Sequence, residues 1–444
     1  MTTTYLILAL TIVLLLCLIV FGVPMPVSFG CCICFMFITL DIPVNSLISI
    51  GYSQTSSYVL LAMPLFVIAG ALMSNSRIGK SIVDWFECLL GRIKACLMPV
   101  SAAAFALFGA VSGSGMAVLS CLTPILFPRM AAKGYPKETV AALLCCAGPL
   151  GLLIPPSCMQ IIYAWSANVS VLTCFLAIVT PGITLTALLA IVSQRIVLKK
   201  NPALNSRAEL VKPKEYIQQL GKSTYHSIPG LLMPIIILGS IYSGVMTTTE
   251  SASVAAVYAL IIAVFLFREI KGNTLVNHMA DAGITTGVIM LNIFFVMIFS
   301  HLMLDAGIKN LLLNLLLSIS DNKMVILLLM NILMVCLGML MDDGCAGILV
   351  ATILVPVVVD LGISPYHFAA ILGVNLGMGN ITPPAAPFLY MSSRITGVPV
   401  KKIMPDVLKL LLLCYLPTLI VTTLWPNFSL WLPQLVMGDK FMMF

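Results

Sequence analysis

The stretch GLLIPPS, residues 151–157, places two adjacent prolines between the apolar runs AALLCCAGPL (141–150) and CMQIIYAW (158–165). Proline lacks a backbone N–H and clashes with the preceding helical turn, so this pair interrupts what its flanks predict to be a long apolar helix. A proline can simply kink such a helix. Alternatively, it frees backbone groups that line a cavity or bind something, and the rest of the chain must decide between these explanations.

The composition indicates a membrane protein. The chain has 444 residues, of which 60% are hydrophobic and only 9% are charged, with a mean hydropathy of +1.11. Soluble domains carry roughly 25% charged residues. Apolar runs that could cross a bilayer recur from Tyr5 almost to Trp425. We therefore predict an all-α polytopic membrane protein with about ten crossing spans, in which the first run, 5–22, is a retained span and not a signal peptide.

The basic residues are concentrated in loops. The longest polar stretch, 199–223, is rich in Lys and Arg, and the positive-inside rule predicts that residues 199–226 form a cytoplasmic linker. The net charge of +7 therefore reflects topology and does not indicate a nucleic-acid surface. The 14 cysteines lie mostly within apolar runs and have no metal-binding spacing.

A second pair of prolines, Pro383-Pro384 in GNITPPAAPF (379–388), lies 228 residues after Pro155-Pro156. At the same spacing, ILFPRMAAKG (125–134) aligns with ILVPVVVDLG (353–362). Each pair of aligned loops is basic in one copy only, as expected if the two copies have opposite orientations in the membrane. We infer an inverted internal duplication.

The duplication predicts where the parts of the two repeats lie. Two apolar limbs of about 15 residues, too short for a core that needs about 20, form a re-entrant hairpin in each repeat, and a Pro-Pro-broken helix follows it. Both termini are predicted to lie outside. The predicted parts are a first repeat (1–198) with hairpin 97–128 and broken helix 138–163, and a second repeat (227–444) with hairpin 325–356 and broken helix 366–391.

Each hairpin tip is expected to face one break. Freed carbonyls can coordinate a cation and helix N-termini can hold an anionic group, so each pair forms an ion and substrate site near the membrane midplane. Simpler explanations remain for the separate motifs. The glycines of GAVSGSG (109–115) suit plain helix packing, and Asp342-Asp343 would be tolerated at a wet interface.

Seven motifs, in order along nearly the whole chain, carry a resemblance to a known family. They are GVPMPVSFG (22–30), LLAMPLFVIAGALM (60–73), GAVSGSGMA (109–117), Gly134-Tyr135-Pro136, GPLGLLIPPS (148–157), GMLMDDG (338–344) and GNITPP (379–384). Together they resemble the large membrane subunit (permease, M subunit) of a tripartite ATP-independent periplasmic (TRAP) transporter, of the wider ion transporter superfamily.

The resemblance implies a function. It implies a sodium-coupled secondary importer with an elevator mechanism and no enzymatic activity, whose substrate is a small organic acid such as a sialic acid, a dicarboxylate or a keto acid. It implies two partners, a small four-span membrane subunit and an extracytoplasmic substrate-binding protein, and a place in the bacterial inner membrane. It implies no cofactor, with sodium ions as coupling ions and no other metal.

The resemblance also implies site residues. The implied sodium ligands are Ser112, Gly113, Ser114, Gly148, Gly151, Pro155, Asp342, Gly344, Asn375, Gly379, Thr382 and Pro383. The implied substrate-binding residues are Ser114, Ser157, Asn380 and Thr382. Hydroxyl, amide and carbonyl oxygens are hard donors that suit sodium. The chain departs from the family at Gly115, where a second Ser commonly follows SGS. No role is assigned to Asp343.

Other functions fit the sequence less well. An intramembrane aspartyl protease needs two facing carboxylates, but the residue after the motif Gly377-Met378-Gly379 is Asn380. GKS occurs at 79–81 and 221–223 without the glycine that a phosphate loop requires, so an ATP-driven pump is disfavoured. A one-component sodium/carboxylate symporter of the same superfamily, or a channel, stays open as the nearer alternative.

Overall fold

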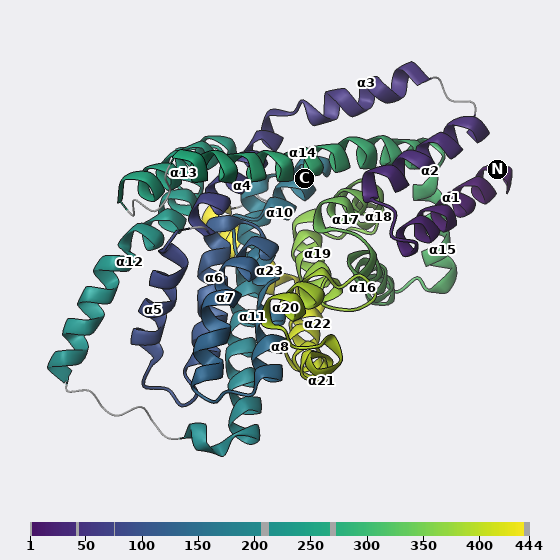
Figure 1. Ribbon diagram of the computed structural model, residues 1–444. Coiled ribbons are helices and arrows are strands. Elements are labelled where there is room, and N and C mark those ends of the chain that lie inside the picture. Colours follow the sequence, from purple (N-terminus) through teal and green to yellow (C-terminus); the bar gives the residue numbers. More distant parts are fainter. Residues whose placement is uncertain (1, 41–43, 75, 206–212, 267–271, 439–444) are drawn as a thin grey trace.

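The chain folds into helices throughout its described part. The computed structural model describes residues 2–40, 44–74, 76–205, 213–266 and 272–438, and all regular elements in these ranges are helical (Figure 1). Eight of them are long and apolar enough to cross a membrane. Two further pairs of helices, each bent at a short break, bring the number of possible spans to ten if each pair is one span. A helix pairs its own backbone N–H and C=O groups, which is necessary in the hydrocarbon core of a membrane, where water is absent. The predicted all-α polytopic class is confirmed.

The first half contains eleven α-helices in the described residues. They are α1 (Thr2–Val20), α2 (Met25–Leu40), α3 (Val44–Thr55), α4 (Ala62–Ser74), α5 (Ile78–Leu90), α6 (Leu97–Ser112), α7 (Gly115–Ala132), α8 (Lys137–Ala147), α9 (Leu150–Leu153), α10 (Cys158–Ser166) and α11 (Val171–Lys200). The predicted linker, 199–226, is helical at both of its ends, because α11 runs to Lys200 and α12 begins at Pro213. Residues 206–212 of this linker lie outside the described residues.

The second half contains twelve. They are α12 (Pro213–Tyr242), α13 (Thr248–Ile261), α14 (Gly272–Asp305), α15 (Ile308–Ile319), α16 (Lys323–Leu340), α17 (Asp343–Leu349), α18 (Val355–Asp360), α19 (Pro365–Gly379), α20 (Pro387–Thr396), α21 (Val400–Leu410), α22 (Leu416–Leu424) and α23 (Pro426–Met437). A π-helical turn at 350–354 joins α17 to α18 without a gap, and another at 411–415 joins α21 to α22.

Two helix-turn-helix units occupy the regions of the predicted hairpins. In the first, α6 ends at a left-handed Gly113 and α7 begins at Gly115. The limbs are longer than predicted, because α7 continues through Pro124 and Pro128 to Ala132 and the second unit extends over 323–360. Three of the four limbs reach 18 residues, so limb length gives no support for re-entrance, which stays a prediction.

Both Pro-Pro pairs interrupt helices. The helical run 137–153 and α10 meet at an angle of 43°, with Ile154 and Ser157 extended on either side of the first pair. In the second half α19 ends at Gly379 and α20 begins at Pro387, and both Pro-Pro peptide bonds are cis. The helices on both sides of the first break are predominantly buried, and so is α19 before the second break, whereas Pro384, Ala385 and most of α20 are not. The first break therefore frees backbone groups inside the protein, and the second lies beside a partly exposed segment.

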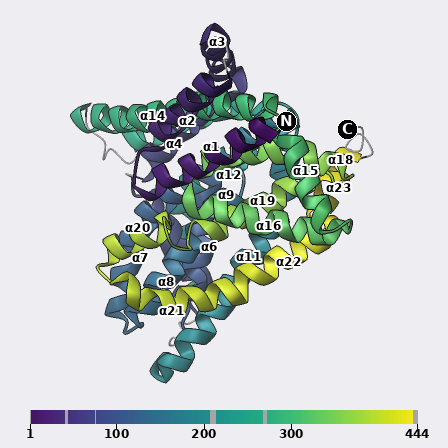
Figure 2. The same ribbon diagram turned by 90° about the vertical axis from the view of Figure 1, so that its right-hand side faces the viewer.

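The helices form two groups that are visible in Figures 1 and 2. In one, α4 packs on α13 and α14, while α14 also packs on α2 and α3. In the other, α6, α7, α8 and α11 pack with α19 to α23, so that helices from both halves of the chain interleave: α20 lies on α7 and α8, and α21 lies on α8. The second group contains both breaks.

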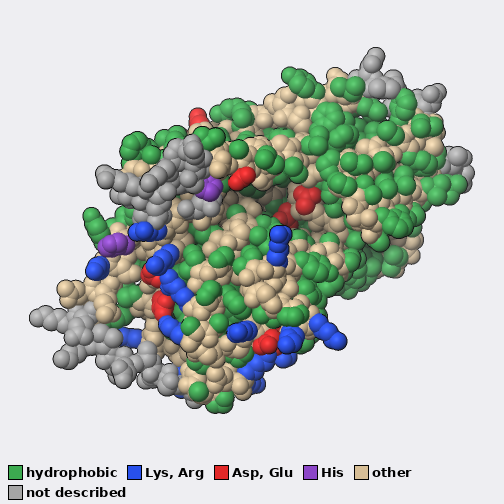
Figure 3. Space-filling view, in the orientation of Figure 1, with side chains coloured by type: hydrophobic (Ala, Val, Ile, Leu, Met, Phe, Trp, Pro, Cys, Tyr) green, Lys and Arg blue, Asp and Glu red, His purple; other side chains and the backbone are tan. Residues whose placement is uncertain are grey.

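Charged side chains occupy only part of the surface. Figure 3 shows Lys and Arg gathered over the lower left and lower centre of this face, whereas its upper right carries hydrophobic and uncharged side chains. Three ion pairs join the end of α7 to α5: Arg129 pairs with Asp84 at 2.6 Å and with Glu87 at 3.5 Å, and Lys133, directly after α7, pairs with Glu87 at 2.5 Å. In membrane proteins, Lys and Arg gather in the loops on the cytoplasmic side, so a basic region next to an apolar surface is typical of this class.

Candidate functional site

The first half-site lies between the α6–α7 turn and the first break. The Cys158 N–H, at the start of α10, donates to the Gly113 carbonyl across 3.1 Å. Gly113 has a φ of +62° and a Cβ there would lie 3.1 Å from the Pro156 carbonyl oxygen. Glycine is required here for both conformation and space. The structure therefore brings the predicted residue Gly113 against the Pro155-Pro156 segment.

Glycines allow the backbones of this half-site to touch. A Cβ on Gly109 would lie 2.8 Å from the Gly151 Cα, and one on Gly151 would lie 2.8 Å from the Gly115 Cα. Real Cβ atoms are not found at such distances, since carbon atoms pack at about 3.5–4.0 Å. Glycine at these three positions therefore lets α6, α7 and α9 touch through their backbones.

Three serine hydroxyls surround this contact. The Ser112 hydroxyl lies 3.3 Å from the Ser114 carbonyl, to which it donates, and 3.5 Å from the Ser114 N–H. Ser157 is fully buried as the residue before α10, and its hydroxyl has no hydrogen-bond partner. Buried hydroxyls are nearly always paired, so the unpaired Ser157 hydroxyl is a candidate ligand group.

The second half-site repeats this arrangement. A Cβ on Gly379 would lie 2.8 Å from the Gly338 Cα, so α19 and α16 touch through glycine as α6 and α9 do. The Ala385 N–H, within the second break, donates to the Met339 carbonyl across 3.2 Å. In both halves a main-chain hydrogen bond thus joins the broken helix to the helix turn.

The two neighbouring carboxylates have different surroundings. Asp342 is exposed and caps α17, its Oδ2 accepting from the Gly344 and Cys345 N–H groups at 3.1 and 3.4 Å. Asp343 is partly buried and accepts a hydrogen bond from the side-chain amide of Asn380, in the second break. Asp342 was the predicted ligand and Asp343 had no assigned role, yet Asp343 is the one that joins the turn to the break.

The other predicted residues of this half lie around the same break. Asn375 is fully buried and donates to the Asn331 side chain at 2.6 Å. The Thr382 hydroxyl donates to the Met378 carbonyl at 2.8 Å, while Pro383 is half-buried beside it. A Cβ on Gly344 would lie 3.2 Å from the Asp342 Oδ2 and 3.4 Å from the Ile162 side chain of α10.

Phe388 connects the two half-sites. A Cβ on Gly148 would lie 2.4 Å from the Phe388 Cδ1, and one on Gly115 would lie 2.7 Å from its Cζ. The ring, from α20 of the second half, thus fills the space above two glycines of the first half. A side chain at either position would meet this ring. No local sequence signal indicated this contact, which joins residues far apart in the chain.

Several buried oxygen atoms in the described residues have no hydrogen-bond partner, and three of them belong to predicted site residues. They are Ser157 Oγ, Asn375 Oδ1 and Asn380 Oδ1, while a further one, Gln160 Oε1, lies two residues into α10. Leaving a buried polar atom unpaired costs about 1–3 kcal/mol, so these atoms are candidate ligand groups. No Lys or Arg is buried in the described part of the chain, and none of its His, Cys, Asp and Glu residues gather in threes. The arrangement offers neutral oxygens and helix ends to an ion or a small anion.

Comparison with known proteins identifies the family. A family model described as "Tripartite ATP-independent periplasmic transporter, DctM component" matches residues 12–428. The chain belongs to this family. It is 33% identical to the C4-dicarboxylate TRAP transporter large permease protein DctM of Pseudomonas aeruginosa, covering 88% of this chain and 90% of that protein. It is 30% identical to the sialic acid TRAP transporter large permease protein SiaM of Vibrio cholerae, covering 93% of this chain and 96% of that protein.

The fold is also similar to a solved transporter. The YdaH transporter of Alcanivorax borkumensis superposes with a TM-score of 0.61 at 17% identity, covering 86% of this chain and 88% of that one. This TRAP large permease is therefore a secondary transporter and a multi-pass protein of the inner membrane, and it is not an enzyme. The geometry agrees, because the Asp343 carboxylate faces the Asn380 amide and a protease would need a second carboxylate.

Proposed function

We propose that this TRAP large permease imports a small organic acid, coupled to sodium. A dicarboxylate, a sialic acid or a keto acid would fit the site, and relatives named for C4-dicarboxylates and for sialic acid support this class of substrate. The observation that carries the proposal is the set of unpaired buried oxygens at both breaks, on Ser157, Asn375 and Asn380. Sodium and a carboxylate substrate together would satisfy such a set.

The first sodium site is proposed at the first half-site. Its ligands would be the Ser112 and Ser114 oxygens together with backbone carbonyls of Gly148 and Gly151. Close contact between Gly151 and Gly115 brings these backbones within the reach of a small cation. The second site would use Asn375, the Gly379 carbonyl, Thr382 and the free Asp342 Oδ1.

The substrate is proposed to lie between the two half-sites. Two helices of eight or more residues begin there, α10 at Cys158 and α20 at Pro387, and a helix N-terminus favours a negative charge. Ser157, Asn380 and Thr382 would orient the carboxylate with their polar groups. Since the described interior holds no buried Lys or Arg, helix ends and bound sodium would supply the positive charge.

Transport is proposed to occur by an elevator movement. The group of helices that carries both breaks would move as one body against the group formed by α2, α3, α4, α13 and α14. Interleaving of the two halves through Phe388 supports a single moving body, because displacing one half-site alone would leave the ring without its contacts with Gly115 and Gly148.

The proposed partners follow the family. A small four-span membrane subunit would cover part of the apolar surface, and an extracytoplasmic binding protein would deliver the acid. A one-component symporter is the alternative, and co-expression separates the two. Uptake into proteoliposomes that contain only this chain would support the one-component alternative, whereas uptake that needs both other components would support the tripartite system.

Sodium binding can be tested by thermal and denaturant unfolding in sodium, potassium and choline chloride. Sodium at 100 times its dissociation constant should add about 2.7 kcal/mol to the free energy of unfolding. Ser157→Ala removes an unpaired hydroxyl, so it should leave stability in potassium unchanged or raised. If that hydroxyl binds the ion, the sodium-dependent gain should fall. Ser101→Ala, which removes a buried hydroxyl paired with the Leu97 carbonyl, is the matched control and should keep the gain.

Uptake tests the site as a whole. The triple variant Ser114→Ala, Asp342→Asn and Thr382→Ala should lose sodium-driven uptake. Thr186→Ala removes the same kind of hydroxyl bond to the carbonyl four residues earlier, in α11, and should transport normally. Normal uptake by the triple variant would contradict the site assignment. Equal stability in all three salts, with the small subunit present, would contradict sodium coupling.

A further inference from the structure

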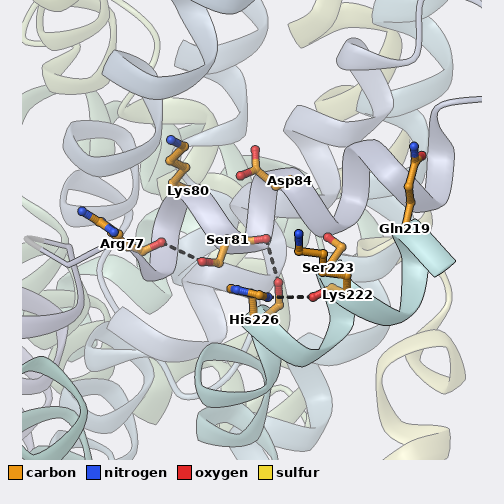
Figure 4. A pocket seen from close by; sticks show the side chains of 9 residues that line it. Arg77, Lys80, Ser81, Asp84, Gln219, Lys222, Ser223 and His226 are labelled. Atoms are coloured by element: carbon orange, nitrogen blue, oxygen red, sulfur yellow. Dashed lines mark hydrogen bonds between the residues drawn. The ribbon is translucent and has the colours of Figure 1, made fainter. Parts of the chain in front are cut away.

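A basic cavity lies between α5 and α12, away from both breaks. Its volume is about 580 Å³. Figure 4 shows Lys80, Ser81 and Asp84 on α5, with Lys222 and His226 on α12. Lys80 and Lys222 are exposed, and the Asp84 carboxylate is already paired with Arg129 outside the cavity at 2.6 Å. The cavity therefore presents positive charge that its own acidic residue does not neutralise.

The walls of the cavity are fixed by contacts between the two helices. The Trp85 indole N–H donates to the Thr224 hydroxyl at 3.0 Å, and the Ser227 hydroxyl donates to the Ser81 carbonyl at 2.8 Å. One turn earlier on α5, buried Ile78 approaches Gly230 so closely that a Cβ on Gly230 would lie 2.7 Å from the Ile78 side chain. These contacts keep Lys80 and Lys222 on opposite sides of one preformed space.

His226 is held against its own helix at the edge of this space. Its Nδ1 lies 2.9 Å from the Lys222 carbonyl oxygen. Because a carbonyl can only accept, Nδ1 carries the proton, and Nε2 of the neutral ring is an acceptor. The lysine ammonium groups are therefore the donors that suit the oxygens of a phosphate group.

An apolar stripe continues from the cavity along α12. Tyr225, Ile228, Leu232 and Ile235 follow Lys222 at intervals of three and four residues, so they lie on one face of the helix. These four side chains are between 40% and 74% exposed. A ligand with a charged head and an apolar tail would match the cavity and the stripe at the same time, whereas a free anion would use only the cavity.

We propose that this surface binds an anionic phospholipid, with its phosphate between Lys80 and Lys222 and an acyl chain along the α12 stripe. The basic residues lie where the positive-inside rule places the cytoplasmic face. Basic pockets between helices at that face bind anionic head groups. The bound lipid would hold the amphipathic helix α5 against α12, independently of ion or substrate binding at the breaks.

The test is native mass spectrometry of the full-length protein in detergent, titrated with phosphatidylglycerol or phosphatidylcholine. The wild-type protein should retain phosphatidylglycerol preferentially. Removing two lysines in Lys80→Gln/Lys222→Gln should weaken that binding about 30-fold. Lys401→Gln/Lys402→Gln removes the same charge from exposed positions on α21 and should change it little.

Two further variants separate the head group from the tail. Lys80→Arg/Lys222→Arg keeps the charge and should bind phosphatidylglycerol nearly as the wild type does. Ile235→Gln interrupts the stripe and should also weaken lipid binding. It should leave the binding of inorganic phosphate in the cavity unchanged.

Several results would overturn the proposal. Equal retention of the two lipids by the wild-type protein would do so without any variant. Inorganic phosphate that competes fully with the lipid, with no effect of Ile235→Gln, would indicate a free-anion site. Lipid retention that responds to Ile235→Gln but not to loss of the lysines would mark the stripe as a contact for acyl chains alone and would contradict the phosphate site.

Discussion

Gly148→Ala should destabilise the protein through Phe388. The new Cβ would lie 2.4 Å from the ring Cδ1 and 2.8 Å from Cε1, whereas carbon atoms pack at about 3.5–4.0 Å. One of the two groups must therefore move by roughly 1 Å. The ring is only 1% exposed and also packs above Gly115, so it has no empty space to enter. Overpacking of this kind costs about 1–3 kcal/mol.

A second substitution shows whether Phe388 causes the loss. Phe388→Leu alone should cost about 1–2 kcal/mol, because it removes buried carbon atoms. In the double variant the smaller side chain leaves room for the alanine methyl group. The combined loss should therefore be smaller than the sum of the single losses by about 1 kcal/mol or more.

The assay is the free energy of unfolding, measured by denaturant titration in detergent for all four members of the cycle. Gly283→Ala, in α14 with nothing within 4 Å of the new Cβ, is the matched control and should be neutral or slightly stabilising. Losses that add within about 0.5 kcal/mol would refute the proposed contact. A Gly148→Ala protein as stable as the control would refute the close packing itself.

Two other predictions concern carboxylates. Lys200→Met should lower the free energy of unfolding by about 1–3 kcal/mol, because it removes the ammonium group that lies 2.5 Å from the buried Asp406 carboxylate. Lys409→Met should cost less, because its contact with Asp406 is longer, at 3.1 Å, and more exposed, and denaturant titration of both variants checks this order. Asp343→Leu should reduce uptake more than Asp342→Asn, because only Asp343 binds the Asn380 amide and its loss leaves that amide unpaired; equal uptake by the two variants would contradict this.

The sequence predicted those features that single residues impose locally. Paired prolines interrupt a helix wherever they occur, and Gly113 permits the left-handed turn, so both breaks and the first turn lie in their predicted ranges. The first hairpin was predicted to end at Pro128, but α7 continues through Pro124 and Pro128 to Ala132. Proline inside a membrane helix is tolerated when neighbouring groups satisfy the freed carbonyls.

The contacts between the halves could not be predicted in the same way. The ring of Phe388 meets Gly148 across 240 positions of the chain, and no periodicity or motif encodes such a pairing. The contact of Asp343 could not be predicted for a related reason. Adjacent residues at a helix start point in different directions, so one caps α17 and the other reaches Asn380.

The bonds from Cys158 to Gly113 and from Ala385 to Met339 join main-chain atoms only. Any amino acid except proline supplies the same N–H, and every amino acid supplies the same carbonyl. Side chains at the two donor positions can therefore change in evolution while each turn keeps its attachment to its broken helix. Transporters that descend from one ancestor could therefore change their substrate by substituting neighbouring side chains, while the main-chain hydrogen bonds stay the same.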